Sequence, residues 1–184
     1  MFKSKIPLQT PLAIKIVLTT TIITFFAGWS LSRDASGEGF DLTQDNIILY
    51  QQNEELSSLI EEVHGAINEY RYDQGLIPLI LDTKISQQAQ IHSQNMADNN
   101  AQFSHAGFEF RIKNIAQNID YQSAAENIAY NQGYSDPAAQ ALKGWINSPG
   151  HQKNMVGNYN LTGVGVAQNP QGEYYFTQIF VLEK

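Results

Sequence analysis

The chain has 184 residues, of which 42% are hydrophobic, and this is enough for the core of one ordinary domain once its N-terminal segment is set aside. Its 18 acidic residues all follow Arg33 and outnumber its 11 basic residues. This acidity argues against nucleic acid as a partner, because binding to phosphate requires clustered Lys and Arg. The chain has no cysteine, which excludes disulfides, thiolate metal sites, thiol catalysis and a lipid-modified cysteine anchor.

Residues 1–33 have the composition of a membrane-targeting segment. Several lysines precede an uncharged and largely apolar run over residues 16–31. The run is shorter than the about 20 apolar residues of a typical spanning helix, and no clear cleavage site ends it. A signal peptide and a retained N-terminal membrane anchor therefore both remain open. Because the positive charge precedes the apolar run, either alternative places the rest of the chain outside the cytoplasm, secreted or anchored in the membrane by its N-terminus.

A polar segment with two glycines, residues 34–53, predicts a linker to a globular domain over residues 54–184. The domain opens with a helical pattern, since apolar residues recur at three- and four-residue steps between Leu56 and Tyr70. Gly75 then predicts a left-handed stop.

Two further helices are predicted from their caps. Asp82 is a typical N-cap for a helix that ends near Asn99. Asp136, followed by Pro137 at the first helical position, begins another helix, which Pro149 terminates.

The hydrophobic period changes toward the C-terminus. Residues 161–168 and 173–182 alternate as two strands, joined by a four-residue hairpin loop, and residues 125–130 predict a further short strand. Gly163 and Gly165 fall on the same strand face, where the missing side chains would let another element approach closely. Helices combined with an antiparallel sheet indicate a mixed α/β domain.

The histidines differ in their surroundings. His64 is predicted to be partly exposed and without a special role, and His92 to be a core residue with a hydrogen-bond partner. His105 and His151 fall in segments predicted to be irregular, where binding residues concentrate. Glu126 is a lone acid in an apolar or neutral stretch, so its carboxylate must be paired, be hydrogen-bonded or line a cleft.

Two imidazoles and one carboxylate form a ligand set that suits zinc and leaves a coordination position open. The spacings of 21 and 25 residues between His105, Glu126 and His151 impose no geometry on these side chains. A structural hydrogen-bond network explains the same residues at least as well as a metal does.

Six segments occur in the order seen in bacterial CAP (SCP-like) domains, which the chain therefore resembles over about residues 56–182. They are INEYR (67–71), AQIHSQNMA (89–97), FSH (103–105), AENIA (125–129), WINSPGH (145–151) and GVGV (163–166) with YFTQIF (175–180). The resemblance implies a three-layer α-β-α sandwich with a mostly antiparallel sheet and a central cleft.

The resemblance also implies a cleft tetrad that can hold a divalent metal such as zinc. His105 and Glu126 match its first histidine and one glutamate, and His151 matches its second histidine. Ser148 stands where eukaryotic members have the second glutamate, so the tetrad is incomplete.

Three functions stay open. The favoured one is a binding module that recognises a lipid, an envelope polymer or a protein through its cleft and loops. The alternative is a metal-dependent, protease-like hydrolase in which Glu126 is a ligand or a base. The third is a structural role in the envelope. Catalysis is not favoured, because no nucleophile, base and acid stand out. Tyrosines near the strands are candidates for the binding surface: Tyr121, Tyr130, Tyr134, Tyr159, Tyr174 and Tyr175.

Overall fold

A computed structural model of the chain describes residues 44–184. The predicted targeting segment, residues 1–33, and the first half of the predicted linker lie outside the described residues. Within the described part of the chain, no helix is both long enough and apolar enough to cross a membrane.

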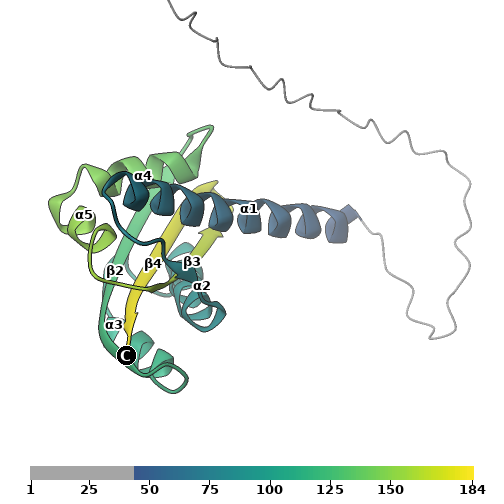
Figure 1. Cartoon of the computed structure of the whole chain (residues 1–184). Helices are drawn as coiled ribbons and strands as arrows, with labels where there is room; N and C mark the ends of the chain where they lie inside the picture. Colours follow the sequence, from purple (N-terminus) through teal and green to yellow (C-terminus); the bar gives the residue numbers. More distant parts are fainter. Residues whose placement is uncertain (1–43) are drawn as a thin grey trace, which may run out of the picture. The chain divides into compact units, whose positions relative to one another are not determined.

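The described residues form five helices and four strands. Figure 1 shows how the labelled elements are arranged. In chain order they are α1 (Gln44–Asp73), β1 (Ile80–Leu81), α2 (Thr83–Ala97), α3 (Phe108–Ile115), β2 (Tyr121–Gln132), α4 (Pro137–Ile146), α5 (Pro149–Met155), β3 (Leu161–Gln168) and β4 (Glu173–Glu183). The strands form one sheet in the order β1-β3-β4-β2. Only β1 and β3 run parallel, so the sheet is mixed and mostly antiparallel, as predicted.

Two hydrophobic clusters, one on each face of the sheet, confirm the three-layer α-β-α arrangement. Successive side chains of a strand point to opposite faces, and β4 shows this clearly. Phe176 and Phe180 pack in the cluster that contains residues of α1, α4 and α5. Ile179 and Val181 pack in the cluster that contains residues of α2 and α3.

The predicted close approach at the glycines of β3 is confirmed. A Cβ atom added to Gly163 would lie 2.2 Å from the backbone nitrogen of Ser86, and one added to Gly165 would lie 2.2 Å from that of Gln90. No L side chain fits at such distances, so α2 lies directly on β3. The N-cap of α2 is also as predicted, because the carboxylate of Asp82 accepts hydrogen bonds from the first-turn amides.

Several elements differ from the sequence-based expectation. Helix α1 begins at Gln44, inside the predicted linker, because residues 44–53 contain no glycine or proline to interrupt a helix. Helix α3 was not predicted, and β2 is longer than the strand expected over residues 125–130. Pro149 does not only end α4: it occupies the first turn of α5, so His151 lies in a helix and not in an irregular segment.

Candidate functional site

The site is built on β2, the strand at one end of the sheet order. Adjacent residues of a strand point to opposite faces, so Glu126 and Asn127 reach different layers of the domain. Glu126 contacts Arg111 of α3, while Asn127 contacts α5. The two neighbouring residues therefore tie both helical layers to the same edge of the sheet.

Glu126 is buried and its carboxylate is fully engaged. Its side chain is 2% exposed. Arg111 donates from Nε to Oε2 at 2.7 Å and from Nη2 to Oε1 at 2.8 Å. His105 Nδ1 lies 2.9 Å from Oε1, and a carboxylate only accepts, so the proton of this hydrogen bond is on Nδ1. The prediction that Glu126 is paired is correct, and its partners are a guanidinium and an imidazole.

Arg111 is the residue of this site that the sequence analysis missed. It is buried on the inner face of α3, and its Nη1 donates to the carbonyl of Ala106 at 3.0 Å. Gly107, with a φ of 77°, makes the left-handed turn that leads from the loop of His105 into α3. A basic residue on the buried face of an amphipathic helix needs a buried acid nearby, and this signal, read together with Glu126, could have identified the pair.

His151 approaches the cluster from α5. Its ring centroid lies 6.4 Å from that of His105. Asn127 Nδ2 donates to the His151 carbonyl at 3.1 Å, and Asn154 Nδ2 donates to Asn127 Oδ1 at 2.9 Å, which fixes α5 against β2. Burial, followed by the neighbouring His105, lowers the pKa of His151 below its usual range, which favours a neutral imidazole at pH 7.

The two other histidines lie outside this cluster. His92 is buried, and its Nε2 lies 3.0 Å from the carbonyl of Ser104, the residue before His105, which confirms the prediction of a hydrogen-bonded core histidine. Burial, followed by the charge of Arg111, lowers the pKa of His92. His64 is partly exposed, as predicted, with its Nε2 3.0 Å from the carbonyl of Leu79.

A pocket of about 260 Å³ opens beside His151, between β2 and α4. Its lining consists of Ile128, Ala129, Tyr130, Gln140, Ala141, Gly144, Trp145, Ser148 and His151. The indole Nε1 of Trp145 donates to the carbonyl of Ile128 at 2.9 Å, which holds α4 at a fixed distance from the strand. Ser148 and His151 thus belong to the pocket, and His151 also adjoins the His105–Glu126–Arg111 cluster.

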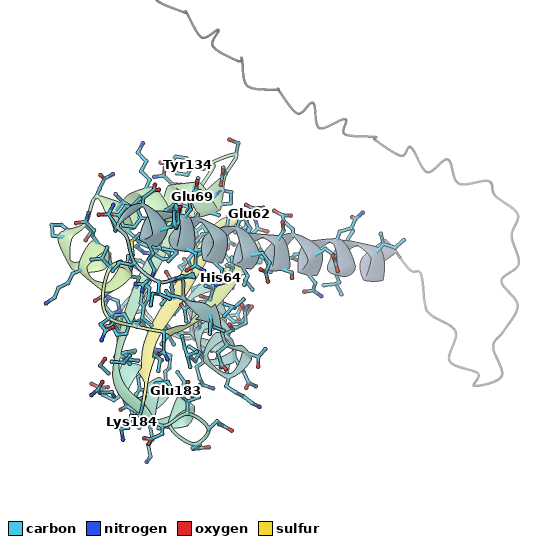
Figure 2. The ribbon with its side chains drawn as sticks, in the orientation of Figure 1. Glu62, His64, Glu69, Tyr134, Glu183 and Lys184 are labelled. Carbon is cyan, nitrogen blue, oxygen red and sulfur yellow. The ribbon has the colours of Figure 1, made fainter. Side chains whose placement is uncertain are left out.

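The candidate tyrosines separate into surface and packing residues. Tyr130 lines the pocket and is 44% exposed, and its ring centroid lies 6.2 Å from that of Phe103 and 5.2 Å from that of Tyr175. Tyr134, on the connection between β2 and α4, is also exposed (Figure 2). The remaining ones pack against other residues: Tyr121 in the α2 and α3 cluster, Tyr159 on Phe180, Tyr174 on Phe176 and Tyr175 on Tyr130.

The geometry does not favour a divalent metal at the three predicted ligands. Over residues 44–184, no three or more His, Cys, Asp or Glu side chains are grouped so that they could hold a metal ion. Both oxygens of Glu126 accept hydrogen bonds from Arg111, so a cation would have to displace the guanidinium to reach the carboxylate. Zinc at His105, Glu126 and His151 stays a prediction.

Two proteins of Bacillus subtilis (strain 168) are similar in sequence to this chain. One is described as an uncharacterized membrane protein, YlbC, and is 38% identical over 125 residues, or 66% of this chain. The other is described as an uncharacterized protein, YkwD, and is 36% identical over 130 residues, or 68% of this chain. The matched regions cover only 34% and 48% of these two relatives, so each of them is much longer than the region it shares with this chain.

A solved structure and a family model give the same result. The structure is that of an extracellular protein containing a SCP domain from Bacillus anthracis str. Ames, with 28% identity and a TM-score of 0.59. The match covers 79% of this chain and 45% of that one. Residues 64–180, which include every residue of the site, match the model of the CAP family, described as the cysteine-rich secretory protein family. The chain therefore belongs to the CAP family, as the six ordered sequence segments indicated.

Proposed function

We propose that this chain is an extracytoplasmic CAP module that binds a component of the cell envelope in the pocket between β2 and α4. The pocket is the observation that carries the proposal, because it is the concave surface at which Ser148 and His151 meet. The location outside the cytoplasm is supported by two similar proteins, one described as a membrane protein and one as an extracellular protein. It is also supported by the composition of residues 1–33.

The lining of the pocket suits a ligand with both apolar and polar parts. Ile128, Ala141 and Trp145 supply buried apolar walls, while Gln140, Ser148 and His151 supply hydrogen-bonding groups. Its volume of about 260 Å³ lies just below the roughly 300–1,000 Å³ of typical small-molecule sites. The pocket therefore suits one moiety of a larger molecule, such as part of a lipid, a wall polymer or a protein side chain.

The contacts of Glu126 weigh against the metal-dependent hydrolase. A carboxylate that serves as metal ligand or general base needs a free oxygen lone pair directed at the reacting group. Here Oε1 accepts from both His105 and Arg111, and Oε2 accepts from Arg111. We therefore propose binding without a catalytic step.

Blocking the pocket with a side chain tests this proposal. Gly144 lines the pocket and has open space where a Cβ would be, so Gly144→Leu places a bulky side chain in the pocket. Gly65→Leu is the matched control, because Gly65 is also helical with open space but does not line the pocket. The full chains are sedimented with peptidoglycan sacculi and, separately, with phosphatidylglycerol vesicles.

The wild type and the two variants all contain the N-terminal segment, so a difference in sedimentation between them reports on the pocket. With either the sacculi or the vesicles, we expect Gly144→Leu to lower the amount of protein that sediments by about tenfold. Gly65→Leu should leave that amount unchanged. Equal sedimentation of all three proteins with both probes would contradict binding of an envelope polymer or lipid in this pocket.

A further inference from the structure

We infer that Arg111 takes the role that a divalent cation would have beside Glu126, so that the cleft is neutralised from within the chain and functions without a metal. This inference concerns the His105–Glu126–Arg111 cluster and does not depend on the ligand proposed for the neighbouring pocket. It assigns a role to a residue that neither the histidines nor the tetrad pattern indicated.

The ion pair of Arg111 and Glu126 has the geometry of a strong contact. The guanidinium meets the carboxylate through two roughly parallel hydrogen bonds of 2.7 and 2.8 Å, from Nε and Nη2. Such paired contacts combine charge with a fixed direction, which a lysine would not provide. Both partners are buried, with side-chain exposures of 10% for Arg111 and 2% for Glu126, so solvent screens the pair weakly.

A metal at Glu126 would have to displace this guanidinium. Arg111 is held at its other end by the carbonyl of Ala106, and α3 carries it on its buried face. A displaced guanidinium would stay buried without a counter-charge, which is strongly unfavourable. The guanidinium of Arg111 therefore already occupies the position beside Glu126 that a divalent cation would need.

Over residues 44–184, no second acidic side chain joins Glu126 and the histidines in a group that could hold a divalent ion. Ser148, and not an acid, lies at the α4–α5 junction beside His151. Arg111 and Glu126 compensate each other, so the carboxylate of this cluster already has its counter-charge. A dication at this point would meet no excess negative charge among the described residues, in agreement with the lack of a three-residue cluster there.

The ion pair fixes the orientation of the His105 ring. Arg111 orients Glu126, and Glu126 accepts the Nδ1 hydrogen bond of His105 at 2.9 Å. The other ring nitrogen, Nε2, does not contact this carboxylate, and the side chain is 51% exposed. Arg111 is thus a positioning residue, and His105 presents its Nε2 edge to a ligand without any metal.

Zinc titration of variants tests the inference. Isothermal titration with zinc chloride at neutral pH compares the full-length wild type with Arg111→Gln, Glu126→Gln and the double variant that carries both changes. We expect wild type and Glu126→Gln to bind zinc equally weakly. Arg111→Gln should bind at least tenfold more tightly, and the double variant should lose this gain. Circular dichroism shows which variants are folded.

Two results would overturn the inference. One is zinc binding by wild type that weakens tenfold or more in Glu126→Gln, and the other is a folded Arg111→Gln protein without a gain in affinity. If Arg111→Gln does not fold, the wild type alone decides by the ¹⁵N resonances of the His105 ring. We expect a protonated Nδ1 that is unchanged by zinc, and loss of this proton on zinc addition would contradict the inference.

Discussion

The inner strand β3 and the edge strand β2 contact their helices in opposite ways. At β3, glycines remove side chains so that α2 lies directly on the strand, and the interface has no room for an added methyl group. At β2, the interface is held by polar side chains, among them the ion pair of Glu126 and Arg111, and a pocket of about 260 Å³ opens beside it.

The contact of α2 with β3 therefore fixes the shape of the domain, while the edge at β2 is the part that can bind a ligand. Close packing of backbone against backbone tolerates almost no change in volume. A polar interface tolerates changes in volume but depends on every buried group having its partner. We therefore expect substitutions that add atoms to be most harmful at β3 and substitutions that remove a charge to be most harmful at β2.

The largest effect is expected for Glu126→Ala. This change leaves the buried guanidinium of Arg111 without its counter-charge, and breaking a buried pair in this way costs about 3–5 kcal/mol of unfolding free energy. Urea unfolding followed by circular dichroism measures the loss.

A double variant is the control for the charge effect. Replacing both partners, as in Glu126→Leu with Arg111→Met, removes the unpaired charge, and we expect it to be more stable than Glu126→Ala. A loss below about 1 kcal/mol for Glu126→Ala would show that the pair is not the main support of this edge.

Gly165→Ala should have the next largest effect. The added Cβ would lie 2.2 Å from the Gln90 nitrogen and 2.3 Å from the Ala89 carbonyl carbon, so α2 must move away from β3. We expect a loss of about 3 kcal/mol, at the upper end of the usual cost of overpacking. Gly144→Ala is the opposite case, because it meets nothing within 4 Å and improves helix propensity by about 0.5–1 kcal/mol. Thermal unfolding that shifts equally for both variants would contradict the contrast between the two regions.

The contact of α2 with β3 was well predicted because the sequence signals for it are local. Asp82 caps α2 within three residues, strand alternation is visible over eight residues, and the glycine spacing of two places both glycines on one face. Each of these features is set by neighbours along the chain.

The polar edge was only partly predictable because its contacts join distant segments. Glu126 was expected to be paired, but its partner, Arg111, lies in a short helix that begins without a side-chain cap and was not predicted. Pro149 was interpreted as the end of one helix, although proline at the first turn equally begins the next one. The proximity of His151 to His105 then follows from packing of α5 on β2, which sequence spacing does not determine.

The residues that precede α2 and α5 should differ in their contribution to the unfolding free energy, by a smaller amount than the changes above. Asp82 accepts two amide hydrogen bonds at the start of α2, so Asp82→Ala should cost about 1 kcal/mol. Ser148 precedes α5 but makes no side-chain cap hydrogen bond, and it lines the pocket. We therefore expect Ser148→Ala to change the unfolding free energy by less than about 0.5 kcal/mol. Chemical denaturation of both variants tests this, and a comparable loss for Ser148→Ala would show that the hydroxyl has a structural role.

The smallest effect that we predict is the pH dependence contributed by His92. Burial, and then the charge of Arg111, lowers its pKa from 6.5 in the folded chain, so below pH 6.5 the unfolded chain binds the proton more readily. The stability from this residue is complete above pH 6.5 and is lost as the pH falls from there toward the folded pKa.

His92→Gln keeps a donor for the Ser104 carbonyl and removes the titration. Unfolding free energies at pH 7.5 and 5.0 should therefore differ less in His92→Gln than in the wild type. His151, whose pKa is also lowered, contributes a slope of the same sign, so His92→Gln should retain part of the dependence and a second change, His151→Gln, should reduce it further. Identical pH profiles for wild type and His92→Gln would mean that His92 is not held neutral by the packing between Arg111 and the loop of His105.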